Sequence, residues 1–302
     1  MTLRLAAAQY PIDVIVSWEA YEGKLRAWFA AAAEQGAQLL VFPEYGSMEL
    51  ARAAGEEVWS DLQRSIDFIG ELRPRIDALH VDLARQHRVH VLAASLPERD
   101  VSDGLAYNVA RLITPLGDVG VQRKIVMTRF EREEWDIRGG RDACVFDTAI
   151  GLVGIAICYD AEFPLIARAM CEAGAELILV PSCTEGAFGY HRVRVGAQAR
   201  ALENQCHVVQ SPTVGTASWS PAVDRNHGAA GVFGPPDLGF PVDGVMSLGV
   251  LNEPQWVFAD ISPAAVERVR REGAVLNHAH WREQPGVPDL AARLVRLRPA
   301  GG

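Results

Sequence analysis

Apolar and polar residues alternate along this chain with two periods, and each period predicts one kind of secondary structure. Short apolar runs predict strands at residues 3–9, 39–42, 90–94, 105–114, 118–124, 145–148, 152–157, 177–180, 207–211, 230–233, 246–250 and 255–260. Longer segments with helical spacing predict helices at residues 17–35, 74–87, 164–172, 192–204 and 263–271. Ser17 is the expected N-cap of the first helix, and Gly36 is expected to end it.

This alternation predicts an α/β fold in which helices cover sheets in layers. Residues 105–114 and 118–124, and likewise 145–148 and 152–157, are separated only by short turns. Such hairpins pair antiparallel strands, so the expected sheet is mixed. No linker or composition break interrupts residues 1–275, which we expect to form one domain. We expect residues 276–302 to form a C-terminal extension that is either disordered or packed at a subunit interface.

Composition argues against two classes of partner. The net charge is −9 without a basic cluster, which argues against nucleic-acid binding. No apolar run reaches about 18 residues, so we expect no transmembrane helix and no membrane partner. The N-terminal residues predict a strand and not a signal peptide. The five cysteines form no C-x-x-C pair, which argues against disulfides or a zinc site and is typical of a cytoplasmic location.

Lysine is rare in this chain. Among 29 Lys and Arg residues, only Lys24 and Lys124 are lysines. A lysine retained in such a composition can serve as a compact positive charge, which the planar guanidinium of arginine does not replace. Lys24 lies in a polar helical stretch, where we expect no particular role. Lys124 ends the predicted strand 118–124, where we expect a functional role.

Three chemically reactive residues lie at the ends of predicted strands: Glu44 after 39–42, Lys124 at the end of 118–124, and Cys158 after 152–157. A carboxylate at the end of a buried strand is desolvated, which raises its pKa into the range useful for proton transfer. An ammonium group there can stabilise an oxyanion and lower the pKa of a thiol. Taken singly, each residue has an ordinary alternative role as a solvated Glu, an edge Lys or an inert buried Cys.

The segment around Cys158 predicts a strand, a sharp turn and a helix that begins near Pro164, which is typical of a nucleophile elbow. The N–H of Tyr159 is then a candidate oxyanion donor, and the nearby helix N-terminus is expected to favour a thiolate. A Cys–His pair in a different fold is the alternative, with His191 or His227 as the base. None of the eight histidines belongs to a metal-binding motif, so no metal site is predicted.

Together, these segments resemble the nitrilase superfamily of carbon–nitrogen hydrolases. Five stretches match in order: residues 5–10; Pro43-Glu44-Tyr45; Arg123-Lys124 with the following Phe130-Glu131-Arg132 and Trp135; Cys158-Tyr159-Asp160-Ala161-Glu162-Phe163-Pro164; and residues 196–205. The resemblance covers roughly residues 3–262, which is most of the chain. Each stretch alone is modest, and the order of all five carries the resemblance.

The resemblance implies a four-layer α-β-β-α sandwich, usually assembled as a homodimer or a higher homo-oligomer, with neither a metal nor an organic cofactor. It also implies roles for the matching residues. Cys158 is the nucleophile, Glu44 transfers protons, and Lys124 with the Tyr159 N–H stabilises the oxyanion. Glu131 corresponds to the accessory carboxylate that positions the substrate or Lys124.

The residues after the cysteine bear on the substrate. Cys-Tyr-Asp-x-x-Phe-Pro resembles amidase-type members, whereas true nitrilases more often have Trp-Glu after the cysteine. We therefore expect a small-molecule amide or N-carbamoyl substrate. Nitrile hydrolysis by the same residues and a non-catalytic regulatory role are the alternatives. Candidate substrate contacts are Tyr45, Glu162, Ser182 and Thr184, and residues 218–240 are a candidate pocket lid.

Overall fold

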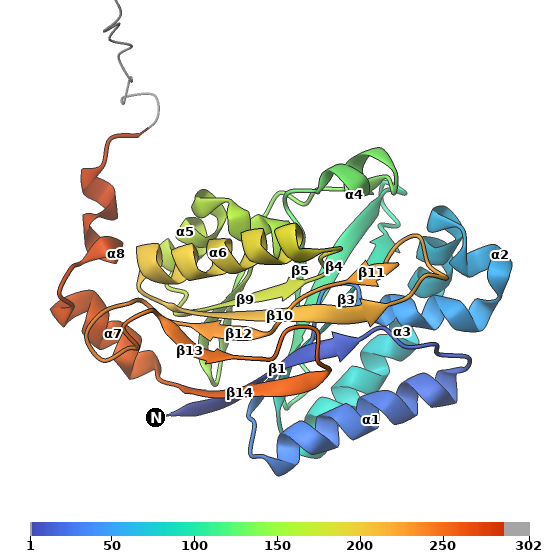
Figure 1. The fold of residues 1–302 in the computed structure, drawn as a ribbon, viewed down its shortest axis with the longest axis horizontal. Coiled ribbons are helices and arrows are strands. Elements are labelled where there is room, and N and C mark those ends of the chain that lie inside the picture. The colour runs from blue at the N-terminus through green and yellow to red at the C-terminus, as the bar shows by residue number, and fades with distance from the viewer. Residues whose placement is uncertain (1, 287–302) are drawn as a thin grey trace, which may run out of the picture.

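The computed structural model describes residues 2–286 and places two layers of strands between two layers of helices (Figure 1). The helices are α1 (Trp18–Glu34), α2 (Glu56–Trp59), α3 (Leu62–His87), α4 (Arg129–Glu133), α5 (Pro164–Glu172), α6 (Ala187–Asn204), α7 (Pro263–Glu272) and α8 (Asn277–His280). Three 3₁₀ helices are η1 (Gly46–Ala54), η2 (Cys158–Glu162) and η3 (Trp281–Glu283). The strands are β1 (Leu3–Pro11), β2 (Leu39–Val41), β3 (His90–Arg99), β4 (Ala106–Ile113), β5 (Val119–Arg123), β6 (Ile137–Arg138), β7 (Val145–Thr148), β8 (Gly151–Ile155), β9 (Leu177–Ser182), β10 (His207–Thr216), β11 (Arg225–Asn226), β12 (Gly231–Phe233), β13 (Val245–Leu248) and β14 (Gln255–Ile261).

The strand β1 joins the two sheets. The strand order is β5-β4-β3-β2-β1-β10-β9-β8-β7, with β14 antiparallel to β1 and with β12 paired to both β10 and β13. β1 runs parallel to its neighbours β2 and β10. The pairs β4–β5 and β7–β8 are antiparallel hairpins. The predicted mixed sheet and both predicted hairpins are therefore confirmed.

Two apolar cores produce the four layers. Alternate residues of β1 face opposite sides, so that Ala6 and Tyr10 pack with α1 and α3, whereas Leu5 and Ala7 belong to the second core. That second core joins the sheet of β1–β4 to the sheet of β8–β10 and to α5 and α6. Because both faces of β1 are covered, nearly every position of this strand is buried. The predicted α-β-β-α sandwich is confirmed.

The helix boundaries agree with the sequence at some ends and differ at others. α1 begins after Ser17, whose hydroxyl caps the first turn as predicted. The predicted start of the second long helix is wrong, because α3 begins at Leu62 and the Asp61 carboxylate accepts two N–H groups of its first turn. Pro74 therefore lies inside α3 and not at its start. α6 likewise begins at Ala187, five residues before the predicted start.

The expectation that Lys24 has no particular role is wrong. Its Nζ atom lies 2.7 Å from Oε2 of Glu49 and 2.8 Å from Oδ2 of Asp13. It also lies 3.9 Å from the ring centroid of Tyr10, the hydroxyl of which donates to Glu49. The 3₁₀ helix η1 carries Glu49 into the core, so α1 must supply a positive charge there.

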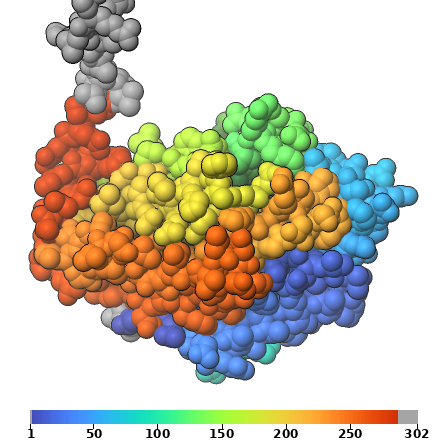
Figure 2. All heavy atoms as spheres, viewed as in Figure 1, coloured from blue at the N-terminus to red at the C-terminus, as the bar shows by residue number. Residues whose placement is uncertain are grey.

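The chain after β14 packs on one end of the molecule. The guanidinium of Arg168 in α5 donates to the carbonyl oxygen of His278 at 3.1 Å and lies 5.0 Å from the ring of Trp281. Figure 2 shows this red segment at the end opposite the light-blue region around α2. Residues 287–302 lie outside the described residues, so the role of the 276–302 extension stays a prediction. Within residues 2–286, every helix lacks the length or the apolar character that crossing a bilayer requires.

Candidate active site

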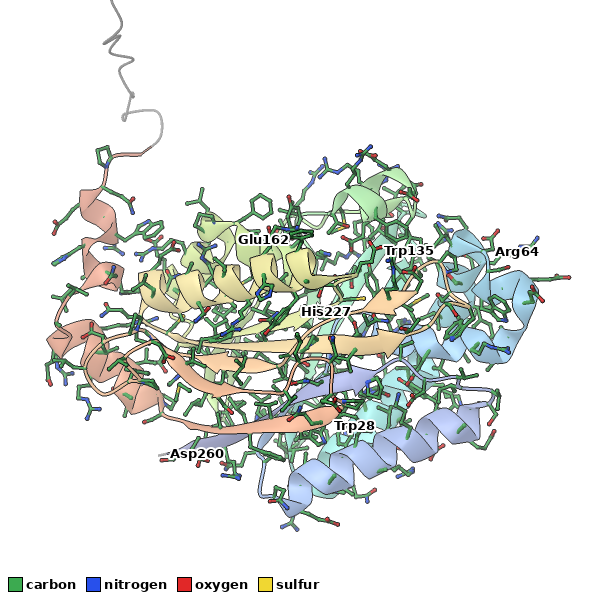
Figure 3. The ribbon with its side chains drawn as sticks, viewed as in Figure 1. Trp28, Arg64, Trp135, Glu162, His227 and Asp260 are labelled. Carbon is green, nitrogen blue, oxygen red and sulfur yellow. The ribbon has the colours of Figure 1, made fainter. Side chains whose placement is uncertain are left out.

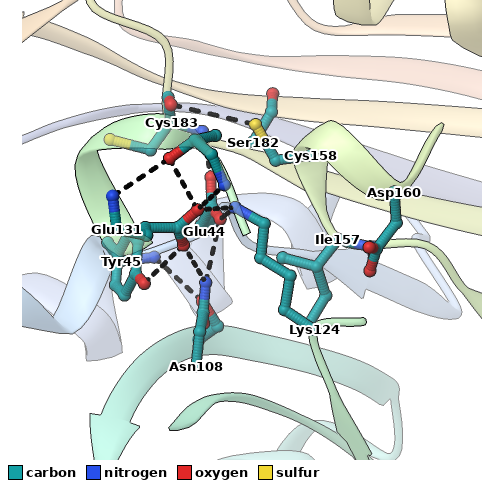
Figure 4. A network of polar contacts seen from close by, with 12 residues as sticks. Glu44, Tyr45, Asn108, Lys124, Glu131, Ile157, Cys158, Asp160, Ser182 and Cys183 are labelled. Atoms are coloured by element: carbon teal, nitrogen blue, oxygen red, sulfur yellow. Dashed lines mark hydrogen bonds and ion pairs between the residues drawn. The ribbon is translucent and has the colours of Figure 1, made fainter. Parts of the chain in front are cut away.

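The strand ends singled out in the sequence meet at one place in the sandwich (Figure 4). Glu44 follows β2, Lys124 directly follows β5, and Cys158 follows β8 and begins η2. β2 and β5 belong to one sheet and β8 to the other, so both sheets contribute to the site. Glu131 joins them from α4. The structure therefore brings together the four residues that the sequence predicts as catalytic.

The Lys124 ammonium group lies between two carboxylates. Its Nζ atom is 2.7 Å from Oε1 of Glu44 and 2.6 Å from Oε2 of Glu131. Glu44 and Lys124 are each 1% exposed and Glu131 is 2% exposed, so these charges interact away from water. Because an ammonium group has three N–H donors, the two ion pairs leave one donor of Lys124 for another acceptor.

The pKa values of the two carboxylates are shifted in opposite directions. Burial raises the pKa of Glu44 to about 7, although the Lys124 ammonium lowers it. Burial also acts to raise the pKa of Glu131, but Lys124 and several hydrogen bonds outweigh it and lower that pKa. Burial disfavours the charge on Lys124, yet Glu131 and Glu44 raise its pKa well above its ordinary value. Glu131 is thus a fixed anion that keeps Lys124 charged, whereas Glu44 can exchange a proton near neutral pH.

Glu131 is fixed from both of its oxygens. Thr128 is the N-cap of α4 and forms a capping box with Glu131, whose Oε2 accepts the Thr128 N–H at 2.9 Å. The Tyr45 hydroxyl donates to Oε1 at 2.7 Å. The Tyr45 ring packs 4.7 Å from the buried Trp135 ring. Thr128 and Tyr45 therefore hold the carboxylate in the orientation that meets Lys124, and Trp135 packs against the Tyr45 ring.

Cys158 occupies a sharp turn with φ of 50°, in the left-handed region that is uncommon for residues other than glycine. Its thiol donates to the Cys183 carbonyl oxygen at 3.8 Å, and the Cys183 N–H donates to Oε2 of Glu44 at 2.9 Å. Burial and the Glu44 charge raise the pKa of the Cys158 thiol, with Lys124 opposing them. The expected lowering of this pKa by a helix N-terminus is wrong: α5 begins at Pro164 as predicted, but burial of the thiol outweighs any such effect.

Asn108 and Cys183 belong to the site although no motif predicts them. Nδ2 of Asn108 donates to Glu44 at 2.9 Å and to Glu131 at 3.4 Å. The backbone carbonyl oxygen of Asn108 also accepts the backbone N–H of Lys124 at 2.9 Å. The available signal in the sequence was an amide side chain within the apolar run that forms β4, and in the structure Asn108 is fully buried. A buried polar side chain in such a run requires partners, and here the partners are the catalytic candidates.

A cavity of about 810 Å³ opens beside Cys158 and Cys183. Its wall carries more acidic than basic side chains: Glu134, Glu162, Glu185 and Asp224 against Arg192 and Arg225. Glu162, which Figure 3 shows beside α6, lies 3.4 Å from Arg192. The volume suits a small molecule, and Cys158 and Cys183 are the two cysteines on its wall.

The predicted substrate contacts divide into two groups. Tyr159, Glu162 and Thr184 line the cavity, whereas Tyr45 and Ser182 do not. The Tyr45 hydroxyl is committed to Glu131, and the buried Ser182 hydroxyl donates to a carbonyl oxygen of β10 at 3.4 Å. Neither side chain therefore lies on the wall that a molecule in the cavity would contact.

The segment 218–240 borders the cavity only in its first part. Residues 221–225 lie on the cavity wall, while Trp219 packs on Trp59 and residues 231–233 form β12. Neither His191 nor His227 is part of that wall, and the His227 ring contacts the Asn252 side chain at 3.1 Å. Among residues 2–286, no three or more His, Cys, Asp or Glu side chains are grouped to hold a metal ion.

The four-layer sandwich places this chain in the structural class of the nitrilase superfamily. Nit3 of Saccharomyces cerevisiae, described as a member of that superfamily, superposes with a TM-score of 0.70, covering 89% of this chain and 93% of its own at 20% identity. An amidase from Nesterenkonia sp. superposes with a TM-score of 0.65, covering 92% and 96% at 23% identity.

The chain belongs to the carbon–nitrogen hydrolase family, whose family model matches residues 4–236. A probable hydrolase of Bacillus subtilis strain 168, YhcX, is 33% identical over 273 residues, which is 90% of this chain. The match covers 52% of YhcX, so the chain spans about half the length of that relative. A deaminated glutathione amidase of Synechocystis is 27% identical over 207 residues, covering 65% of this chain and 72% of its own. The family resemblance predicted from the sequence is confirmed.

Proposed function

We propose that this chain hydrolyses the carbon–nitrogen bond of a small amide or N-carbamoyl compound through a thioester on Cys158. One observation carries the proposal. Lys124 forms ion pairs with two buried carboxylates, one with a raised pKa and one with a lowered pKa. This cluster lies next to Cys158, which lines the cavity. A proton-exchanging carboxylate, a fixed cation and a thiol are the groups that acyl transfer requires.

The first half-reaction forms the acyl-enzyme. Glu44 takes the thiol proton of Cys158 as the sulfur bonds to the carbonyl carbon, and the carbonyl π electrons move onto oxygen. The remaining N–H of Lys124 stabilises that oxyanion, and the N–H of Tyr159 is the second candidate donor. When the carbonyl reforms, the carbon–nitrogen bond breaks, and Glu44 gives its proton to the departing ammonia or amine.

The second half-reaction releases the acid. Glu44 takes a proton from a water molecule that attacks the thioester carbon, and a second oxyanion forms. Its collapse breaks the carbon–sulfur bond, and Glu44 returns the proton to the Cys158 sulfur. A pKa of about 7 suits Glu44 to act as base and acid in turn at neutral pH. Glu131 keeps Lys124 charged throughout.

The relatives support this reading. The similar proteins include amidases, and in one Nesterenkonia amidase structure the acetamide moiety of fluoroacetamide is covalently added at the active-site cysteine. The alternative of nitrile hydrolysis also has a relative, since a nitrilase of Pyrococcus abyssi is 32% identical over 185 residues. Substrate assays must therefore separate the two.

The test is ammonia release from three sets of compounds: small amides, N-carbamoyl compounds and nitriles. We expect release from an amide or an N-carbamoyl compound, and hydroxylamine should divert the thioester formed from an amide to a hydroxamic acid. Release from nitriles alone would contradict the proposed substrate class. No release from any compound would favour the non-catalytic alternative.

Replacing Lys124 with arginine is expected to lower kcat by about 10²-fold or more, the usual cost of removing one oxyanion donor. The charge is kept, but a planar guanidinium is larger and cannot occupy the buried space between Glu44 and Glu131. Steady-state kinetics on the best amide checks the result.

The matched control is Lys24→Arg, the same change at the other lysine. Lys24 also pairs with a buried carboxylate, that of Glu49, but it lies outside the site. We expect little change in kcat there. Equal kcat values for Lys124→Arg and the wild type would remove Lys124 from the mechanism.

A further inference from the structure

The carboxylate of Asp160 accepts hydrogen bonds from three backbone N–H groups. Oδ1 accepts from Val126 at 2.7 Å and from Ile125 at 3.2 Å. Oδ2 accepts from Ile125 at 3.1 Å and from Ile157 at 3.2 Å. The Asp160 side chain is fully buried, and among the described residues no Lys, Arg or His side chain forms a salt bridge with it. Its charge is therefore held by backbone dipoles, as in an anion-binding nest.

The positions of these N–H groups connect the two halves of the site. Ile125 directly follows Lys124, and Ile157 directly precedes Cys158. Lys124 comes from the end of β5 in one sheet, and Cys158 follows β8 in the other. Asp160 is thus bonded to the backbone beside the oxyanion lysine and beside the nucleophile, and Figure 4 shows it next to Ile157 on the Lys124 side of the cluster.

Asp160 also stabilises the turn that presents Cys158. Its own N–H donates to the Ile157 carbonyl oxygen at 3.0 Å, while its carboxylate accepts the Ile157 N–H. These two bonds close the turn in which Cys158 takes its positive φ. A left-handed conformation at a residue other than glycine persists only where its surroundings over-determine it.

Burying this carboxylate is costly, which indicates that its location matters. Burial raises the pKa of Asp160 to about 6, and the Val126 N–H, the Lys124 charge and the Ile125 N–H limit that rise. An apolar residue would fill a core position at lower cost. The three N–H groups, however, would then lose their acceptor, and the N–H of Ile157 is fully buried.

We propose that Asp160 is a positioning residue that fixes the Cys158 turn against the Lys124 loop. The Cys158 thiol and the Lys124 ammonium group can then contact the same carbonyl group of the substrate. This inference rests on the proposed function. Without the carboxylate, the two sheets still pack through their apolar core, but the turn and the loop are no longer joined at the site. The consequence falls on the chemical step more than on substrate binding.

The first test is Asp160→Asn, which keeps the shape and removes one acceptor oxygen. The amide NH₂ then faces a backbone N–H whichever way it is turned. We expect kcat to fall by about 10²-fold, the scale of a small misplacement of reacting groups, with KM nearly unchanged. The control is Asp237→Asn, because the Asp237 carboxylate also accepts two backbone N–H groups, those of Ala274 and Leu238, far from the cavity. It should keep kcat.

A second pair of variants covers the case in which Asp160→Asn does not fold. Val126→Pro removes the N–H that makes the shortest of these bonds, from a partly exposed loop, whereas Val126→Ala keeps it. We expect kcat to fall for the proline variant and not for the alanine variant. Wild-type kcat in both Asp160→Asn and Val126→Pro would overturn the proposal.

A readout without turnover separates this inference from the proposed function. The rate of Cys158 alkylation by iodoacetamide, measured against pH, reports the surroundings of the thiol in any variant. We expect its profile to shift in Asp160→Asn and Val126→Pro but not in Asp237→Asn. If the wild type hydrolyses no compound yet the profile shifts, the proposed function fails and the positioning role stands. An unshifted profile in both variants contradicts the positioning role.

Discussion

Replacing Cys158 with alanine is expected to lower the rate of ammonia release by about 10⁵-fold or more, because the covalent pathway is lost entirely. The remaining groups can still bind the substrate and polarise its carbonyl, so a small residual rate would come from Lys124 and Glu44 acting on water. Ammonia release from the best amide, measured under saturating substrate for both proteins, checks this. Retention of more than a small fraction of the wild-type rate would contradict the thioester mechanism.

Two other cysteines supply the controls. Cys171 is buried in α5, away from the cavity, so Cys171→Ala creates a similar small gap and should keep activity. Cys183 lines the same cavity as Cys158, which makes it the stricter comparison. Low-dose iodoacetamide followed by peptide mapping should label Cys158 first. Preferential labelling of Cys183 would indicate that the reactive thiol is Cys183 and would contradict the proposed role of Cys158.

The positions of the reactive residues could be predicted because each one ends a strand with a clear pattern. Residues 39–42 and 152–157 are continuous apolar runs, which mark strands buried on both faces. The first chemically reactive residue after such a run lies just beyond the carboxyl end of the strand, which is where Glu44 and Cys158 lie. Lys124 was conspicuous because the chain has only one other lysine.

The supporting residues could not be predicted because their partners are distant in sequence. Asn108 contacts Glu44 across 64 residues, and Tyr45 contacts Glu131 across 86. Such contacts depend on the register of β3 with β4 and on the way the loop after β2 meets α4. Tyr45 follows the catalytic candidate Glu44 directly, and sequence alone cannot say whether its hydroxyl faces a substrate or a second carboxylate.

Two errors have local physical causes. A proline is favoured in the first turn of a helix, so Pro74 suggested a start there. The stronger signal was Asp61, the N-cap, which lies thirteen residues before the predicted start. Lys24 was expected to have no particular role because its neighbours in α1 are polar. Lys24 forms an ion pair with Glu49, which lies in η1. The local sequence pattern does not predict that η1 buries Glu49 in the core.

Replacing Glu44 with glutamine is expected to lower kcat by about 10³-fold, within the range attributed to general acid–base catalysis. Glutamine keeps the shape and can still accept from Lys124, but it cannot take the proton of Cys158 or of water. The wild type should gain activity as the pH rises through about 7, where Glu44 ionises. The variant should lose that acid limb, and pH–rate profiles of both proteins measure it.

Stability should change in the opposite direction from activity. Burial raises the pKa of Glu44 from its ordinary value of 4.5 to about 7. The stability associated with protonated Glu44 is fully present below pH 4.5 and is lost as the pH rises through about 7, a change of about 3 kcal/mol. Glutamine does not titrate, so the unfolding free energy of Glu44→Gln should rise relative to wild type over that interval. Urea denaturation at both ends of the interval measures the difference.

Glu49→Gln separates the two effects. Glu49 is also fully buried beside a lysine, and burial raises its pKa as well, but it lies outside the catalytic cluster. Its replacement should therefore change the pH dependence of stability while the acid limb of activity remains. If Glu49→Gln removed the limb as Glu44→Gln does, the limb would report folding and not proton transfer. If Glu44→Gln kept the acid limb, the limb would not report the ionisation of Glu44. Glu44 would then not be the base of the reaction.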